Sequence, residues 1–250
     1  EIIRTLVLKE KGVLTPFDSP SAEDIPAVFK DPDGYWVGFA GRARVLVYNT
    51  DLVADEDAPK NMADLTNPKW RSQAAIAYPL FGTTSTHVTA LYGRMGEQKL
   101  EKFLRAMVAN DIQVVDGNGL VRDLVVAGNL KIGLTDTDDA QAAIRKGRPI
   151  RMVYPDQEGD GTMVIPNTVA RMAGGPNPEP AQQLINYLLS KEVEKQLAFM
   201  DTAQIPFREA VPRPAYVKGA DQLKVMTVNY HRAVADLDAA MTLAQDIFAR

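Results

Sequence analysis

The chain has 250 residues, enough for one large domain or for two small α/β lobes. Its net charge is −4, and positive and negative residues are interspersed along the sequence. Proteins that bind nucleic acid usually carry a basic patch, so no nucleic-acid partner is expected. No apolar stretch approaches the length that crosses a bilayer, and the absence of cysteine excludes disulfides, thiolate metal sites and cysteine nucleophiles.

The chain opens with apolar residues that share one helix face, and we expect a helix over residues 1–11, followed by a loop with short helical pieces over 15–35. From residue 42 to residue 154, short β-branched runs alternate with helical patterns, which predicts a mostly parallel sheet covered by helices. The expected strands are 45–48, 74–78, 112–115, 131–134 and 150–154, and the expected helices are 61–70, 83–95, 97–109, 119–127 and 137–146.

The last third of the sequence begins with an extended segment over 163–170 and then becomes helical. We expect helices over 178–190 and 191–200, and a helical region with one or two breaks over 219–249. The sequence has no motif of a nucleophile elbow, a phosphate-binding loop, a dinucleotide-binding turn or a zinc protease. We therefore expect a binding protein rather than an enzyme, without a cofactor.

Three loops each follow an expected strand and precede an expected helix, and in an open α/β sheet such strand ends border the ligand crevice. In the first loop a glycine precedes four hydroxyl residues at a helix start, where unpaired N–H groups can bind an anion. A plain helix cap, the alternative, needs only one hydroxyl. The candidate ligand-binding residues of this loop are Gly82, Thr83, Thr84 and Ser85.

The second and third loops add an amide and a group of carboxylates. Asn118 can form a plain turn, cap the helix or donate its amide to a ligand. Asp136, Asp138 and Asp139 surround Thr137 at a helix start, and they are more carboxylates than one cap requires. The surplus can hold a ligand amine or a hard metal ion, or simply face solvent.

Several ordered segments resemble the ferric-ion-binding family of periplasmic solute-binding proteins. The run from Gly41 to Asn49 is similar to the hinge strand of that family, and the run from Leu65 to Trp70 is similar to the segment that follows it there. Further similar segments keep the same order and cover nearly the whole chain: Pro79–Thr84, Gly117–Asn118, Ala127–Gly128, Ala181–Ser190 and Lys191–Ala198.

The resemblance implies a two-lobed α/β type II solute-binding fold, with the first lobe incomplete because the family has a strand, a helix and a strand before the residue that matches Glu1. The first lobe would comprise residues 1–41 and 164–205 and the second lobe residues 42–163, with 206–250 as C-terminal helices packed on the second lobe. It also implies a small-molecule ligand, an ABC permease as partner, a monomer, and a location in the periplasm or on a lipid anchor outside the cell. The family's anion site maps onto Gly82, Thr83, Thr84, Asn118 and Arg42.

One departure from the family concerns the ligand. Iron-binding members place two adjacent tyrosines where this chain has Asp138 and Asp139, so the usual iron site is not reproduced. We therefore expect a small anionic or zwitterionic solute, such as a phosphonate, a phosphate ester or a carboxylate. Its acid group would lie at Arg42 and the loop over 82–85, and its positive end at Asp136, Asp138 or Asp139. Thr137 is a further candidate ligand-binding residue of this loop. The alternatives are ferric iron or another metal at Asp136, Asp138 and Asp139, and a truncated fragment that binds nothing.

Overall fold

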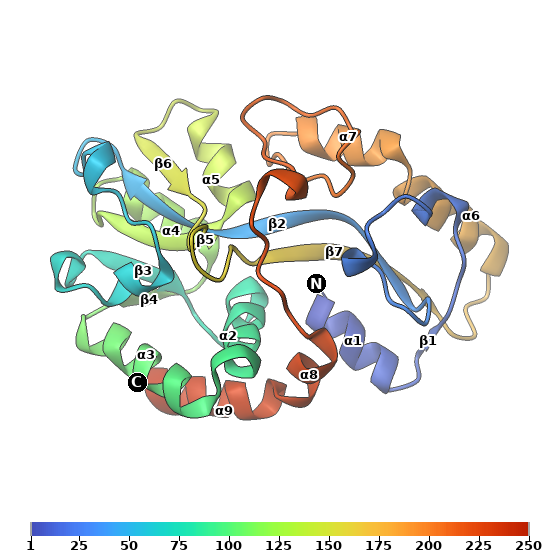
Figure 1. Ribbon diagram of the computed structural model, residues 1–250, viewed down its shortest axis with the longest axis horizontal. Helices are drawn as coiled ribbons and strands as arrows, with labels where there is room; N and C mark the ends of the chain where they lie inside the picture. Colours follow the sequence, from blue (N-terminus) through green and yellow to red (C-terminus); the bar gives the residue numbers. More distant parts are fainter. Residues whose placement is uncertain (1, 250) are drawn as a thin grey trace. The chain divides into compact units, whose positions relative to one another are not determined.

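The computed structural model describes residues 2–249, apart from the side chain of His231. It divides into two compact units, each made of two separate stretches of the chain. Unit 1 comprises Glu1–Arg42 and Val164–Lys224, and unit 2 comprises Ala43–Met163 and Val225–Arg250. The long strand β2 (Trp36–Asn49) starts in unit 1 and ends in unit 2 (Figure 1).

Unit 2 contains the second part of β2 together with β3 (Ala74–Ala77), β4 (Gln113–Val115), β5 (Ile132–Asp136) and β6 (Ile150–Val153). Strands β4, β3 and β5 are parallel neighbours, whereas β2 is antiparallel to both β5 and β6. The prediction of a mostly parallel sheet is therefore wrong at β2. Alternating strand and helix patterns predict crossovers, but they do not reveal a strand that enters from another unit and pairs in the opposite direction.

The α-helices described in unit 2 are α2 (Gly82–Met95), α3 (Glu97–Ala109), α4 (Asn118–Val126), α5 (Thr137–Ile144), α8 (Tyr230–Ala235) and α9 (Leu237–Phe248). Helix α4 packs on β3 and β5, α5 packs on β6, and the C-terminal pair α8 and α9 packs on α2 and α3 (Figure 1). A glycine allows α4 to approach the sheet closely, because a Cβ added to Gly133 would lie only 2.4 Å from Cγ1 of Val121. This packing fixes the start of α4 beside the end of β5.

Unit 1 contains α1 (Ile2–Glu10), β1 (Leu14–Thr15), the first part of β2, β7 (Val164–Met172), α6 (Pro178–Leu188) and α7 (Lys191–Phe199). Strand β1 pairs antiparallel with β7, and α1 and α6 pack on β7. In its core the rings of Phe29 and Phe207 stack at a centroid distance of 3.7 Å. The buried Arg208 forms ion pairs with Glu194 and Asp24 at 2.5 Å each.

Two expected helical regions differ from the structure. The segment 61–70 consists of two short 3₁₀ helices, Met62–Thr66 and Pro68–Trp70, because Pro68 cannot donate an N–H to a continuous helix. In the region 219–249, only a 3₁₀ turn at Ala220–Gln222 precedes α8, and residues 223–229 are not helical. The segment 206–250, expected as one packing element, is divided: residues 206–224 belong to unit 1 and residues 225–250 to unit 2.

Among residues 2–249, no helix combines the length and the apolar character needed to cross a membrane.

Candidate functional site

A buried arginine in β2 organises the candidate site, which lies within unit 2. Arg44 has no exposed surface, and its Nη1 donates to Thr83 Oγ1 and to Asn118 Oδ1, both at 3.0 Å. The same nitrogen lies 2.5 Å from Oδ1 of Asp136. Nη2 donates to Thr84 Oγ1 at 3.1 Å. One guanidinium therefore joins the first turn of α2, the first residue of α4 and the residue that precedes α5.

Asp136 completes this network with its second carboxylate oxygen. Oδ2 accepts hydrogen bonds from Thr83 Oγ1 at 2.6 Å and from Asn118 Nδ2 at 3.0 Å. Asp136 occupies the N-cap position of α5, yet its side chain makes no capping hydrogen bond there. The side chain of Asp136 is 2% exposed and faces Arg44, so the two buried charges compensate each other.

The starts of α2 and α4 have no side-chain cap. Their N-cap residues are Phe81 and Gly117, and neither side chain accepts a hydrogen bond from the first turn. Gly82, the first residue of α2, is exposed, has a φ of +57°, and has no heavy atom within 4 Å of the position a Cβ would occupy. The first N–H groups of a helix lack intrahelical partners and carry the positive end of its dipole. The two helix starts can therefore accept a negatively charged group.

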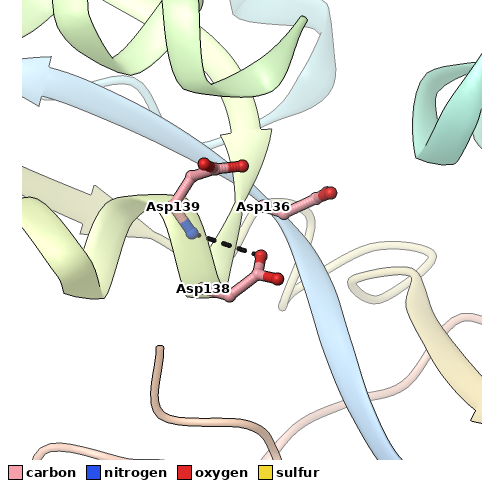
Figure 2. Close-up of side chains that lie close together, drawn as sticks. All are labelled: Asp136, Asp138 and Asp139. Atoms are coloured by element: carbon pink, nitrogen blue, oxygen red, sulfur yellow. Dashed lines mark hydrogen bonds between the residues drawn. The ribbon is translucent and has the colours of Figure 1, made fainter. Parts of the chain in front are cut away.

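Two carboxylates lie in the first turn of α5, next to Asp136 at its N-cap (Figure 2), and Asp139 is close to Gly119 at the start of α4. Asp138 and Asp139 are partly exposed, and one oxygen from each lies within 4.8 Å of an oxygen of Asp136. The backbone N–H of Asp139 donates to Oδ1 of Asp138 at 3.2 Å, and Arg122 on α4 approaches Asp139 at 3.5 Å. This arrangement can hold the positive part of a solute, because hard cations and amines both bind carboxylate oxygens.

A histidine lies beneath the site, in α2. His87 is 2% exposed, and its Nε2 has no hydrogen-bond partner among the described residues. Burial, together with the nearby positive charge of Arg44, lowers the pKa of His87 to about 3. The imidazole is therefore neutral at physiological pH and adds no charge to the site.

Four of the expected site residues are brought together around Arg44: Thr83, Thr84, Asn118 and Asp136.

Other expected residues have different partners. The hydroxyl of Ser85 contacts the sulfur of Met241 at 3.2 Å, and that of Thr137 accepts a hydrogen bond from the backbone N–H of Ala43 at 3.1 Å. Arg42 belongs to unit 1, where its Nη2 donates to Asn167 at 2.8 Å.

Arg44, the centre of the network, is not among the residues expected from the sequence. The sequence does contain a pattern that indicates its importance, because this charged residue lies inside the otherwise apolar run from Ala43 to Tyr48 of a buried strand. A charge in such a position is almost always paired, so it predicts a buried partner.

The chain matches one protein family and several curated relatives. The family described as "Bacterial extracellular solute-binding protein" matches residues 7–231. Iron uptake protein A1 of Synechocystis is 28% identical over 241 residues, which is 92% of this chain and 66% of that protein. The Fe(3+)-binding periplasmic protein of Serratia marcescens is 26% identical, covering 77% of this chain and 58% of that protein. A putative 2-aminoethylphosphonate-binding periplasmic protein of Salmonella typhi is 21% identical, covering 83% and 61%.

Solved structures match over almost the whole chain. Apo ferric ion-binding protein A of Pasteurella haemolytica superposes with a TM-score of 0.88 at 21% identity, covering 100% of this chain and 82% of that one. A Trichodesmium protein in complex with iron and citrate ligands gives 0.85 at 24% identity, covering 100% and 81%. The protein AfuA of Actinobacillus pleuropneumoniae with bound fructose-6-phosphate gives 0.84 at 21% identity, covering 98% and 79%. These matches confirm the type II solute-binding fold expected from the sequence. The chain itself spans 66% or less of the length of the curated relatives named above.

Proposed function

Because this chain belongs to the bacterial extracellular solute-binding protein family, we propose that it captures a small solute outside the cytoplasm and delivers it to the permease of an ABC importer. It would work in the periplasm or from a lipid anchor, as a monomer, and would break no bond in the solute. The observation that carries this proposal is the pairing, within unit 2, of two uncapped helix starts with the carboxylates of α5.

The negative part of the solute would bind at the first turns of α2 and α4. Gly82 lets an anion approach the backbone without meeting a side chain, and the hydroxyls of Thr83 and Thr84 are turned toward Arg44. In this arrangement Arg44 and Asp136 hold the three helix starts in place, and the backbone N–H groups provide the contacts to the anion.

The positive part of the solute would bind at Asp138 and Asp139. We propose a hard metal ion, with ferric iron as the leading candidate, bound together with a small oxygen-rich anion. Two observations support the metal. One oxygen from each of Asp136, Asp138 and Asp139 lies within 4.8 Å of the others, and two of the three curated relatives above are named for iron uptake or for Fe(3+) binding. These names favour the metal over the organic anion that the sequence alone favoured.

A zwitterionic organic solute is the second candidate. It is favoured by the carboxylates of Asp138 and Asp139 at the positions where the resembling iron-binding family has tyrosines. A carboxylate pair suits an ammonium group as well as a metal, and a neighbouring anion site would bind the acid group of the same molecule. Among the relatives above is a putative binding protein for such a solute, 2-aminoethylphosphonate.

Titration calorimetry with three probes separates these candidates. Ferric citrate brings a metal with an anion, 2-aminoethylphosphonate brings an amine with an anion, and fructose-6-phosphate brings an anion alone. For the favoured probe, we expect Asp138→Asn/Asp139→Asn to lose about a hundredfold or more in affinity, since loss of outer-sphere partners alone costs 10–100-fold.

The matched control is Asp238→Asn/Asp246→Asn, which removes the same charge from the exposed side of α9. It should bind the probe as the unmodified protein does. If Asp138→Asn/Asp139→Asn binds ferric citrate as tightly as the unmodified protein does, the metal site is contradicted. If fructose-6-phosphate is the one probe that binds, and its affinity does not depend on Asp138 or Asp139, the function is limited to capture of an anion.

A further inference from the structure

Arg122 of α4 lies between two carboxylates of different exposure. Its Nε donates to Oδ1 of Asp123 at 2.8 Å, and its Nη2 lies 2.8 Å from the same oxygen. Its Nη1 extends in the other direction, to Oδ1 of Asp139 at 3.5 Å. The side chain of Asp123 is 61% exposed, whereas those of Arg122 and Asp139 are 23% and 26% exposed. The guanidinium therefore connects an exposed carboxylate to the partly buried α5 carboxylate.

The contact between Arg122 and Asp139 is also adjacent to the start of α4. A Cβ added to Gly119, the second residue of that helix, would lie 3.6 Å from Oδ1 of Asp139 and 3.7 Å from Nη2 of Arg122. The charge of Arg122 is thus located where a solute that spans the α4 start and the α5 carboxylates would have to lie. An arginine there acts on both parts of the solute: it attracts an anion and it repels a cation.

The long separation of the Arg122–Asp139 pair indicates that a cation can displace the arginine. A strong ion pair has a nitrogen–oxygen distance of about 2.7–2.9 Å, and Arg122 meets that distance with Asp123 but not with Asp139. The pair with Asp139 at 3.5 Å is weak enough for a cation to displace it. Asp123 then keeps the guanidinium in place after displacement, so the arginine need not leave the surface of α4.

We propose that Arg122 is a specificity-determining residue that acts as an internal counter-ion of Asp139, and that the cationic part of the solute displaces it. This inference rests on the proposed function, because it takes the α5 carboxylates as the cation-binding groups. It follows that Arg122 weakens the binding of every cation at the site and excludes those whose charge density is too low to compete for Asp139.

The test uses Tb³⁺, a hard trivalent cation, in calorimetric titrations of the full chain. Arg122→Met removes the charge and keeps a long stem and good helix propensity, and we expect it to bind Tb³⁺ about threefold to tenfold more tightly. Arg122→Lys keeps the positive charge and should bind as the unmodified protein does. Adding Asp139→Asn to Arg122→Met should abolish the gain, because the two residues act through one contact.

Arg105→Met is the matched control, since it removes one positive charge from an exposed pair with Glu101 in the same unit. It should leave Tb³⁺ affinity unchanged. An Arg122→Met variant with unchanged or weaker Tb³⁺ binding overturns the inference, and so does a gain that persists in Arg122→Met/Asp139→Asn.

The same Tb³⁺ titrations give a different result if the proposed function itself is wrong. If Asp138→Asn/Asp139→Asn binds Tb³⁺ as tightly as the unmodified protein, or if no variant binds it at all, the cation site itself is refuted.

Discussion

Replacing Arg44 by methionine gives the most direct test of the network that positions the site. The change removes the guanidinium and leaves the carboxylate of Asp136 buried, in a side chain that is 2% exposed, with the neutral donors of Thr83 and Asn118. Breaking a buried ion pair from one side costs about 3–5 kcal/mol. A domain of ordinary stability has about 5–15 kcal/mol in total, so we expect a large fraction of the free energy of unfolding to be lost.

Urea unfolding followed by circular dichroism measures this loss. The control is Arg94→Met, which breaks an ion pair with Asp160 in the same unit, where the two side chains are 34% and 59% exposed. Exposed pairs contribute about 0–1 kcal/mol, so Arg94→Met should change the free energy of unfolding very little.

A second variant identifies the cause of the loss. Asp136→Asn in the Arg44→Met background neutralises the orphaned carboxylate and keeps its shape, so it should recover part of the lost stability. If Arg44→Met costs no more than Arg94→Met, or if Asp136→Asn adds its own full penalty instead of recovering stability, the buried pair does not organise the three helix starts.

Further predictions concern packing, protonation and the anion site. Gly133→Ala should destabilise unit 2 by about 1–3 kcal/mol in urea unfolding, because the new methyl would lie 2.4 Å from a methyl of Val121; unchanged stability would contradict the close packing of α4. The native protein holds His87 neutral with a pKa of about 3, whereas the unfolded chain binds a proton near pH 6.5. Stability should therefore fall as the pH drops below about 6.5, by up to about 1.4 kcal/mol per pH unit, and His87→Gln should reduce this slope in unfolding curves recorded from pH 7 to pH 5. Gly82→Ala places a side chain at a φ of +57°, which costs about 1 kcal/mol, and it should weaken binding of the solute's anion in calorimetry; an unaltered affinity would exclude the α2 start from the site.

Local sequence patterns predicted most of the helices and strands of this protein. The helix expected over 97–109 is α3, Glu97–Ala109, and the strand expected over 150–154 is β6, Ile150–Val153. Patterns of this kind depend on neighbouring residues alone. The direction of β2 could not be predicted in the same way, because it depends on residues that lie far away in the sequence: Val45 pairs with Thr135 and Leu46 with Val153.

The candidate site was predicted less completely than the fold. The three loops were identified because each follows a strand, and Thr83, Asn118 and Asp136 are joined by hydrogen bonds. Arg42 was named because of the resemblance to a family, whereas Arg44 is indicated only by the burial pattern of the strand. Ser85 shows a second limit: its spacing in the hydroxyl run does not reveal that the helix turns its side chain toward Met241.

The path of the chain between the two units has a consequence for folding during synthesis. The chain passes from one unit to the other between residues 42 and 43, between 163 and 164, and again between 224 and 225. Neither unit is therefore continuous in sequence, and α8 and α9 complete unit 2 only after all of unit 1 has been translated. The core of each unit can close only after the second stretch of that unit has been synthesised, which favours slow folding through exposed intermediates that need protection from aggregation. For the same reason, a gene fragment that encodes unit 2 alone would need an artificial join between residues 163 and 225.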